Sequence, residues 1–295
     1  MKIGIAGTGR MGAAMATRLL ACSHSVSVWN RSLQKTEALV RAGATVTATP
    51  QELSTNAEVV ITMLSDAPAI DATYRAAQGL LAGEVRGKLF IDMSTVRPEI
   101  EKALAESVRA RGAALIECPV GGTVGPAKEG KLFGFVGGEA ADVERARPLL
   151  NDLCRRVEHV GAIGAGASVK LAINLPLLVY YQALGEALSL CRNVDIDPVR
   201  LIDIFADTSG GPNMLKVRGA AIAATLQGKE TTPVTFDVNL IRKDLRTMLD
   251  EAHGLSVRLP LTAQALERYD EAALKGLGAS DATMLPAYWL RHGQA

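Results

Sequence analysis

Residues 2–12, KIGIAGTGRMG, contain the stretch that decides the fold. The apolar run Lys2–Ala6 predicts a buried strand, and glycines at positions 7, 9 and 12 follow it at the spacing of a dinucleotide-binding turn. The first glycine permits the tight turn, the second lets a pyrophosphate approach the backbone, and the third packs helix against strand. A helix over Met11–Leu20 would then offer N–H groups to the phosphates. We therefore predict a cofactor site that includes Gly7, Thr8, Gly9, Arg10, Met11 and Gly12.

The residues after the second predicted strand, Trp29-Asn30-Arg31-Ser32, indicate which nucleotide is bound. An NAD site usually has an acidic residue here, about 20 residues after the glycines, that binds the ribose 2′-hydroxyl. A carboxylate would repel a 2′-phosphate, whereas Arg31 can pair with one through two hydrogen bonds and Asn30 and Ser32 can add more. The sequence therefore predicts NADP(H) rather than NAD(H). The alternative is that Arg31 is an ordinary solvated arginine.

Up to about residue 160, short apolar runs alternate with helical patterns. Strands are expected at Lys2–Ala6, Val26–Trp29, Val59–Met63, Leu89–Asp92, Ala113–Glu117, Phe133–Val136 and Arg155–His159. Helices are expected at Met11–Leu20, Leu33–Ala42, Pro98–Arg111 and Ala140–Leu150. This alternation predicts a parallel sheet that is covered by helices on both faces.

From about residue 163 the strand patterns stop, and glycines at 161, 164 and 166 mark the change. Helices are expected at Ala167–Asn193, Pro198–Asp207, near Pro212–Leu226, Val238–His253 and Leu261–Lys275. We predict an α/β domain of the Rossmann type over residues 1–162 and an all-α domain over residues 163–295, joined by a long helix. The long apolar helices of the second domain favour a homodimer or a homotetramer.

Composition and charge argue against several kinds of partner. With 32 basic and 31 acidic residues the net charge is +1, which gives no electrostatic case for nucleic acid or an anionic membrane surface. The most apolar segment, Leu171–Cys191, is about long enough to span a bilayer, but Asn174, Pro176, Gln182 and Glu186 favour a buried helix. Four dispersed cysteines show no metal-ligand spacing, and the N-terminus lacks a signal-peptide pattern. We expect a cytoplasmic protein with reduced thiols and no metal.

Lys170 is the candidate for proton transfer, because the four histidines, at 24, 159, 253 and 292, belong to no motif. Lys170 and Asn174 are four residues apart, so they share one face of a helix that is otherwise apolar. A lysine in such a helix either extends its amine to water or is a buried functional amine. The residue pattern alone leaves both alternatives open.

Five ordered motifs resemble those of the β-hydroxyacid dehydrogenases, a family that includes 3-hydroxyisobutyrate dehydrogenase and the glyoxylate/succinic semialdehyde reductases. The resemblance covers essentially the whole chain, and five motifs in order are far more specific than one. They are the glycine motif with Met11, Ile91-Asp92-Met93-Ser94-Thr95, Glu117–Thr123 followed by Gly130-Lys131-Leu132, Gly164–Asn174, and Phe236 with Lys243-Asp244-Leu245.

The resemblance implies roles that the residue patterns alone do not give. Lys170 would be the general acid that protonates a carbonyl oxygen as hydride arrives, and Asn174 would hold the substrate. The remaining substrate-binding residues would be Ser94, Gly121, Gly122 and Thr123. Further cofactor-binding residues would be Thr95, Lys243 at the nicotinamide end, and Met63 and Leu64 beside the adenosine half. The alternative for Met63 and Leu64 is that they are ordinary core residues.

The chain departs from the family pattern at Gly121, where the family usually has a serine whose hydroxyl binds a substrate carboxylate. Pro176, inside the helix of Lys170, is a second departure and should bend that helix. The leading hypothesis is reduction of a small aldehyde or keto acid. An imine reductase or reductive aminase is the alternative, which the altered loop favours and Lys170 opposes. A non-catalytic nucleotide-binding module would be expected to lack Lys170 or Asn174, and a decarboxylating phosphogluconate dehydrogenase would need a longer helical domain than this chain has.

Overall fold

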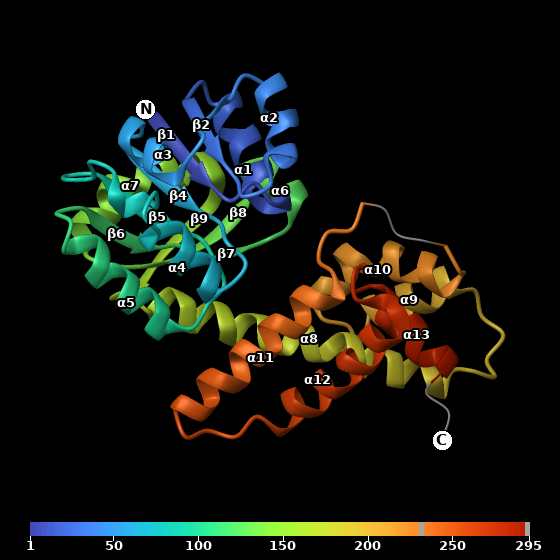
Figure 1. Ribbon diagram of the computed structural model, residues 1–295. Coiled ribbons are helices and arrows are strands. Elements are labelled where there is room, and N and C mark those ends of the chain that lie inside the picture. Colours follow the sequence, from blue (N-terminus) through green and yellow to red (C-terminus); the bar gives the residue numbers. More distant parts are fainter. Residues whose placement is uncertain (230–232, 293–295) are drawn as a thin grey trace. The chain divides into compact units, whose positions relative to one another are not determined.

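The computed structural model describes residues 1–229 and 233–292, and its internal contacts divide the chain into two compact units (Figure 1). The first unit, Met1–Leu171, contains the sheet, and the second, Ala172–Ala295, consists of helices and their connections in its described part. The predicted fold class, a Rossmann-type unit followed by an all-α unit, is confirmed. The division falls inside the long helix, after the expected domain boundary at residues 162/163, which stays a prediction.

The first unit alternates strands and helices as predicted. Its strands are β1 (Lys2–Ala6), β2 (Ser25–Trp29), β3 (Thr45–Val46), β4 (Val59–Thr62), β5 (Leu89–Asp92), β6 (Ala114–Glu117), β7 (Val120–Gly121), β8 (Leu132–Gly137) and β9 (Cys154–Gly161). Its helices are α1 (Arg10–Ala21), α2 (Glu37–Arg41), α3 (Pro50–Asn56), α4 (Ala67–Arg75), α5 (Pro98–Arg109), α6 (Val124–Lys128) and α7 (Ala140–Leu153), with 3₁₀ turns η1 (Leu33–Thr36) and η2 (Leu80–Ala82). Every expected strand is present, and its ends lie within about two residues of the prediction.

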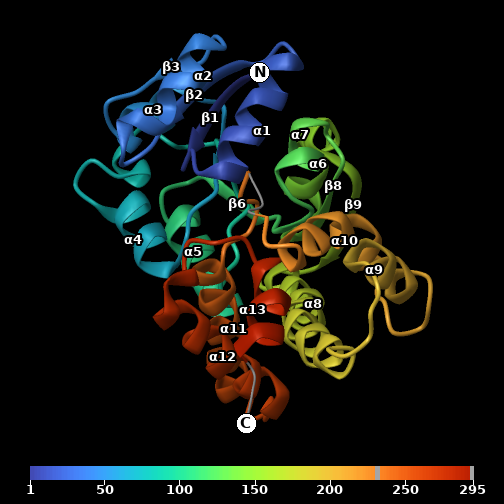
Figure 2. The same cartoon turned by 90° about the vertical axis from the view of Figure 1, so that its right-hand side faces the viewer.

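The sheet has two apolar faces because alternate residues of each strand point to opposite sides. Its strand order is β3-β2-β1-β4-β5-β6-β8-β7, with β9 paired to β8. On one face Ile3 and Ile5 of β1 pack in a cluster with residues of α1, α6 and α7. On the other face Val60 and Phe90 pack in a cluster with residues of α3, α4 and α5. In Figure 2, α4 and α5 lie to one side of the sheet and α6 and α7 to the other.

The sheet is mostly parallel, as predicted, but β8 runs antiparallel to β6 and β7. A parallel neighbour needs a crossover of a dozen or more residues, usually a helix packed on the sheet. The chain between β6 and β8 is instead used for the short strand β7 and the helix α6, so it turns back before β8 begins. β9 returns to parallel pairing with β8 after the crossover helix α7.

Besides the five-residue α6, two helices of the first unit, α3 and α4, were not predicted, although each of these two has capping signals in the sequence. Thr49 caps α3 by accepting a hydrogen bond from the N–H of Glu52, and Asp66 caps α4 by accepting one from the N–H of Ala69. Each helix also has a proline in its first turn, where the missing N–H has no helical partner. Their short length hides the apolar period that longer helices show.

A long helix, α8 (Ala165–Leu190), begins in the first unit and continues into the second. It passes through Pro176 as one helix, and the expected bend stays a prediction. The other helices of the second unit are α9 (Pro198–Ala206), α10 (Asn213–Leu226), α11 (Val238–Gly254), α12 (Pro260–Ala272), a π-helical turn η3 (Ala273–Leu277) and α13 (Met284–His292). The sequence did not predict α13, in which Pro286 is tolerated because it lies in the first turn.

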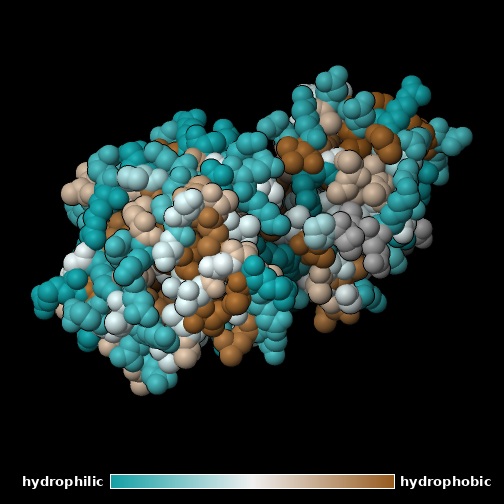
Figure 3. Space-filling model, turned by 90° about the horizontal axis from the view of Figure 1, so that it is seen from above, coloured by the Kyte–Doolittle hydropathy of each residue, from teal (hydrophilic) through white to brown (hydrophobic). Residues whose placement is uncertain are grey.

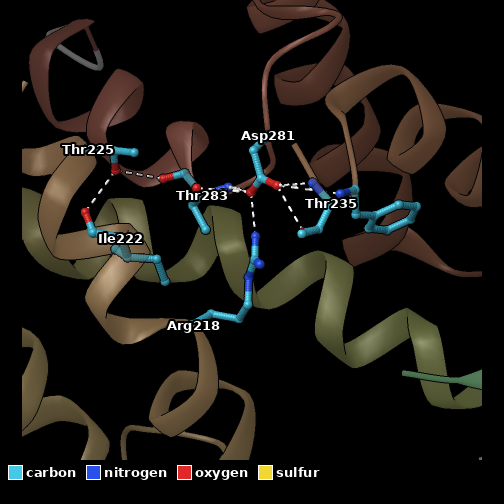
Figure 4. Close-up of polar contacts among 7 residues, drawn as sticks. Arg218, Ile222, Thr225, Thr235, Asp281 and Thr283 are labelled. Carbon is cyan, nitrogen blue, oxygen red and sulfur yellow. Dashed lines mark hydrogen bonds and ion pairs between the residues drawn. The ribbon is translucent and has the colours of Figure 1, made fainter. Parts of the chain in front are cut away.

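A buried carboxylate holds the second unit together near the start of α13 (Figure 4). Asp281 is 2% exposed, and its Oδ1 accepts hydrogen bonds from Arg218 Nη2 at 2.5 Å and from the backbone N–H of Thr283 at 3.1 Å. Its Oδ2 accepts bonds from the backbone N–H of Thr235 at 2.8 Å and from the Thr235 hydroxyl at 3.0 Å. Asp281 therefore ties α10 to two segments that are distant in sequence.

Candidate active site

The first candidate site lies where the parallel strands end. From β1 the chain runs outward through β2 to β3 and then returns to β4 on the other side of β1. In doubly wound sheets, ligands bind in the crevice beyond the strand ends at such a change of direction. Gly7 directly follows β1, so the fold brings the glycine motif to this position.

The three glycines of the motif meet different steric surroundings. Gly7 has φ +97°, and a Cβ there would clash with the carbonyl oxygen of Met63. A Cβ at Gly12 would clash with the carbonyl oxygen of Gly7, so α1 packs against the end of β1 only because no side chain intervenes. Gly9 is the N-cap of α1, and no described atom lies within 4 Å of the place where its Cβ would be. The motif thus has the geometry that a bound pyrophosphate requires.

Asn30 shapes the loop after β2. Its Oδ1 accepts a hydrogen bond from the backbone N–H of Thr8 at 3.0 Å, and its Nδ2 donates to the carbonyl oxygen of Ser32 at 2.9 Å. These bonds connect the glycine motif to the loop that was predicted to select the nucleotide. Arg31 lies exposed on that loop, between Asn30 and Ser32.

The residues that follow β4 and β5 lie next to the glycine motif and to each other. A Cβ at Gly7 would lie 3.0 Å from Leu64 Cδ2, and the backbone N–H of Leu64 donates to Ser94 Oγ at 3.0 Å. The backbone N–H of Ser94 in turn donates to Asp92 Oδ1 at 2.8 Å. Met63, Leu64 and Ser94, predicted from the family resemblance, are therefore brought together with the nucleotide motif, and Thr95 follows directly in the chain.

The predicted substrate loop begins in β7 and ends at α6. Gly121 pairs with Phe133 of β8, and a Cβ on Gly121 would lie 3.6 Å from Phe133 Cβ and 3.6 Å from Phe135 Cε2, an ordinary contact. A serine would therefore fit at position 121. Gly122 has φ +120°, which favours glycine, and Thr123 is the N-cap of α6.

Lys170 is buried, being 9% exposed, in the part of α8 that belongs to the first unit. Ser168, two residues earlier, is exposed, so the two residues lie on different faces of the helix. Of the two alternatives that the sequence left open, the structure favours the buried amine over one that extends into solvent.

Asn174 belongs to a polar network of the second unit. It is 7% exposed, and its Nδ2 donates to Asp244 Oδ2 at 3.4 Å. Lys243 Nζ lies 2.6 Å from Asp244 Oδ1. Asp244, which is 4% exposed, therefore connects the two residues that the resemblance implies, and it was left out of the predicted site. The signal for it was a carboxylate on the buried face of an amphipathic helix, directly after Lys243.

Three buried carboxyl groups of the first unit were also missed: Asp92, Glu101 and Glu117, each 0% exposed. Burial raises the pKa of Asp92 and raises that of Glu101 well above its usual range. Burial likewise raises the pKa of Glu117 to about 7, although three backbone N–H groups act in the opposite direction. Groups with shifted pKa values cluster at functional sites more often than elsewhere.

The other candidate groups have structural roles. His24 Nε2 lies 2.8 Å from Asp152 Oδ2, and His159 Nε2 lies 2.9 Å from the carbonyl oxygens of Gly138 and Gly161. Burial raises the pKa of the Cys118 thiol well above its usual range and that of Cys154 to about 12. Among residues 1–229 and 233–292, no group of three acidic, histidine or cysteine side chains is arranged to hold a metal ion.

Comparisons with known proteins match both units. Residues 2–161 match the model of the NAD binding domain of 6-phosphogluconate dehydrogenase, and residues 164–289 match that of the NAD-binding of NADP-dependent 3-hydroxyisobutyrate dehydrogenase. Glyoxylate/succinic semialdehyde reductase 1 of Arabidopsis thaliana is 32% identical over 95% of this chain and 96% of its own length. The 3-hydroxyisobutyrate dehydrogenase of Pseudomonas aeruginosa is 34% identical over 89% of each chain. The solved structure of Psf3 in complex with NADP+ and 2-OPP is 29% identical, with a TM-score of 0.86 over 97% of this chain and 99% of that one.

A Rossmann-type unit with this glycine motif, followed by a helical unit, defines a nicotinamide-dependent oxidoreductase. Its relatives act on hydroxy and oxo groups by name, and the chain shares their fold over nearly its whole length. The chain belongs to the β-hydroxyacid dehydrogenase family and is an NAD(P)-binding enzyme.

Proposed function

We propose that the protein reduces a small aldehyde or keto acid, such as glyoxylate or a semialdehyde acid, with NADPH as reductant and Lys170 as general acid. The burial of Lys170 in α8 is the observation that carries the proposal. The names of its relatives, a glyoxylate/succinic semialdehyde reductase and a 3-hydroxyisobutyrate dehydrogenase, refer to small hydroxy acids and aldehyde acids.

Reduction of a carbonyl needs one hydride and one proton. NADPH, when bound, supplies the hydride that forms the new bond to the carbonyl carbon. The carbonyl π electrons move to oxygen as that bond forms, and Lys170 Nζ donates a proton to the developing alkoxide. The product is the alcohol, and the neutral amine regains its proton from water. In the opposite direction the same amine would accept the alcohol proton.

The network of Asn174, Asp244 and Lys243 supports a role for Asn174 in substrate binding. An amide side chain can present its oxygen or its nitrogen, and a wrongly turned amide would present the wrong group to a substrate. Because Asp244 accepts a hydrogen bond from Asn174 Nδ2, the nitrogen end of the amide points toward the Asp244 carboxylate, and the orientation of the whole amide is fixed. The ion pair with Lys243 holds Asp244 in place and balances its charge.

The choice of NADP(H) over NAD(H) depends on Arg31. It is exposed on the loop after β2, and Asn30 holds that loop to the glycine motif through Thr8. A guanidinium in this position can pair with a 2′-phosphate, and the loop from Trp29 to Ser32 has no carboxylate to repel one.

Gly121 favours a second candidate, reduction of an imine. Without a side-chain hydroxyl at this position, the loop offers one hydrogen-bond donor fewer to a substrate carboxylate, and Phe133 and Phe135 lie against the space. Lys170 argues for carbonyl reduction as the main activity. A panel of aldehyde acids, keto acids and cyclic imines with NADPH decides between the two by which class gives the highest kcat/KM.

The second unit exposes apolar side chains that a homo-oligomer would cover. Leu190, Val194, Val199 and Val217 are each more than half exposed, and a groove of about 450 Å³ lies between α9 and α10. Figure 3 shows hydrophobic patches on one face of the molecule. By length and composition α8 could also cross a membrane, a test that core helices pass as well. We propose a cytoplasmic homodimer or homotetramer that binds neither nucleic acid nor membrane; a monomer by light scattering would contradict the oligomer.

Two alanine variants test the mechanism. Lys170→Ala should lower kcat by about 10²–10⁴-fold, the usual loss for an acid–base group, while NADPH still binds. Arg31→Ala should raise KM for NADPH at least about tenfold and leave KM for NADH nearly unchanged. Lys128→Ala and Arg41→Ala, which remove exposed charges elsewhere in the first unit, are the matched controls. Unchanged turnover in Lys170→Ala would remove the lysine from the mechanism, and equal effects on both nucleotides would refute the role of Arg31.

A further inference from the structure

Glu117, the last residue of β6, binds the first turn of the helix that carries Lys170. Its Oε1 accepts hydrogen bonds from the backbone N–H groups of Gly164 at 2.5 Å and Gly166 at 2.9 Å. Its Oε2 accepts one from the N–H of Ala167 at 3.1 Å. The first N–H groups of a helix have no partner within the helix, and here one carboxyl group from a neighbouring strand satisfies two of them together with the N–H of Gly164, the residue before the helix.

The surroundings leave room for this carboxyl group and for nothing larger. A Cβ on Gly137 of β8 would clash with Glu117 Oε1. A Cβ on Gly166 would clash with the carbonyl oxygen of Phe135 and lie 3.3 Å from Glu117 Cδ. Gly164 has φ +98°, which lets the chain turn into α8 with its N–H toward the carboxyl group. The contact therefore fixes where α8 begins.

The same contact fixes the position of Lys170. The residues that Glu117 binds and Lys170 itself lie in adjacent turns at the start of α8, within the first unit. Lys170 is three residues after Ala167, a rise of about 4.5 Å along the axis. Residues three or four apart share a helix face, so a shift of the first turn moves the Lys170 backbone directly. Misplacement of a catalytic group by about 1 Å can lower turnover by up to about 10²-fold.

We propose that Glu117 is a positioning residue, whose carboxylate on the first turn of α8 sets the place of Lys170 for proton transfer. The inference rests on the proposed role of Lys170. Glu117 acts through the helix and does not take part in the chemistry itself.

The charges around Glu117 make this contact sensitive to pH. Asp92 on β5, Glu101 on α5 and Cys118, which directly follows β6, interact with it, and Lys102 on α5 lies beside Gly164. Burial, which outweighs the hydrogen bonds, raises the pKa of Glu117 to about 7. Burial and the neighbouring carboxyl groups raise the pKa of Glu101 well above its usual range.

Protonation of Glu117 weakens its hydrogen bonds to the start of α8. The carboxylate accepts three N–H groups, whereas the acid must use one oxygen to hold a proton and accepts less strongly. The rate of reduction should therefore fall on the acid side of neutrality as Glu117 gains its proton.

Glu117→Gln tests the proposal, with Glu101→Gln as the matched control. Both replace a buried carboxyl group of the same cluster by a neutral group of equal size, but the described contacts of Glu101 include no N–H of α8. In Glu117→Gln we expect kcat at pH 8 to fall roughly tenfold, KM for substrate and Kd for NADPH to change less than about twofold, and the acid limb near pH 7 to vanish. Glu101→Gln should retain both the limb and most of kcat.

The outcomes separate this proposal from the proposed function. A wild-type kcat that is flat from about pH 6 to 8 would overturn the positioning role even if Glu117→Gln failed to fold. Loss of the acid limb in Glu101→Gln would overturn it too, as would an unchanged pH profile in Glu117→Gln while Lys170→Ala is inactive. An active Lys170→Ala would instead refute the proposed function.

Discussion

Glu117 in the first unit and Asp281 in the second are both buried carboxyl groups that accept backbone N–H groups, yet their pKa values move in opposite directions. Burial raises the pKa of Glu117 to about 7, because the described contacts of its carboxyl group are with N–H groups that do not offset the loss of water. Burial also acts on Asp281, but the N–H groups of Thr235 and Thr283 and the charge of Arg218 outweigh it and lower its pKa.

The difference shows how a paired arginine changes the pKa of a buried carboxyl group. A carboxylate paired with an arginine stays charged at every physiological pH and serves as a fixed joint between segments. A carboxylate held by backbone dipoles alone remains free to gain a proton near neutrality. The second arrangement suits a contact that positions a catalytic group, and the first suits the interior of a helical unit.

The largest effect is expected from Asp281→Asn, which tests whether the Asp281–Arg218 pair stabilises the second unit. The variant leaves the partly buried Arg218 charge without its carboxylate partner and turns an amide donor toward N–H groups that need an acceptor. Breaking such a pair typically lowers the free energy of unfolding by about 3–5 kcal/mol. The unfolding midpoint of the second unit should fall by roughly 10 °C in calorimetry.

Asp270→Asn is the control, because Asp270 also pairs with arginines but is more than one-third exposed. It should shift the midpoint by no more than a few degrees, since exposed pairs contribute about 0–1 kcal/mol. Equal shifts of the unfolding midpoint in the two variants would show that Asp281 does not stabilise the second unit as described above.

A smaller effect, of opposite sign in the two units, is expected from pH. Asp281 has a folded pKa below its usual 3.8, so its contribution is complete above about pH 4 and is lost as pH falls through the folded value. Glu117 has a folded pKa of about 7 against 4.5, so its contribution is complete below about pH 4.5 and is lost as pH rises through 7.

Calorimetry from pH 4 to 8 should therefore show the first unit losing stability as pH rises, while the second stays nearly constant. Asp92 and Glu101 act in the same direction as Glu117, so Glu117→Gln should remove part of the slope. A first unit whose midpoint rises with pH across this range would contradict the assignment.

The sequence predicted features that are encoded locally. The glycine motif, the strands and the Lys170–Asn174 face follow from short-range pattern, and the structure agrees with each. The caps of α3 and α4 at Thr49 and Asp66 were also local, and their capping signals could have been used. The predicted roles in catalysis and binding came from family resemblance and stay predictions.

Features that depend on distant partners could not be predicted. Glu117 meets the start of α8 about 50 residues later in the chain, and Asp281 meets Arg218 across 63 residues. No periodicity records such pairs, since each residue alone is an ordinary carboxyl group. The reversal of β8 has the same origin, because strand direction depends on how the intervening chain packs.

The most direct test of the account is chemical rescue of Lys170→Ala. The variant, saturated with NADPH and an aldehyde acid, should turn over about 10²–10⁴-fold more slowly than the wild type. Added small primary amines should restore part of that rate in proportion to their protonated concentration, and should leave the wild type and Lys128→Ala unaffected. Hydride transfer can be measured in a stopped-flow experiment through the absorbance of NADPH. If Lys170→Ala transferred hydride at the wild-type rate without any added amine, the result would contradict the central claim.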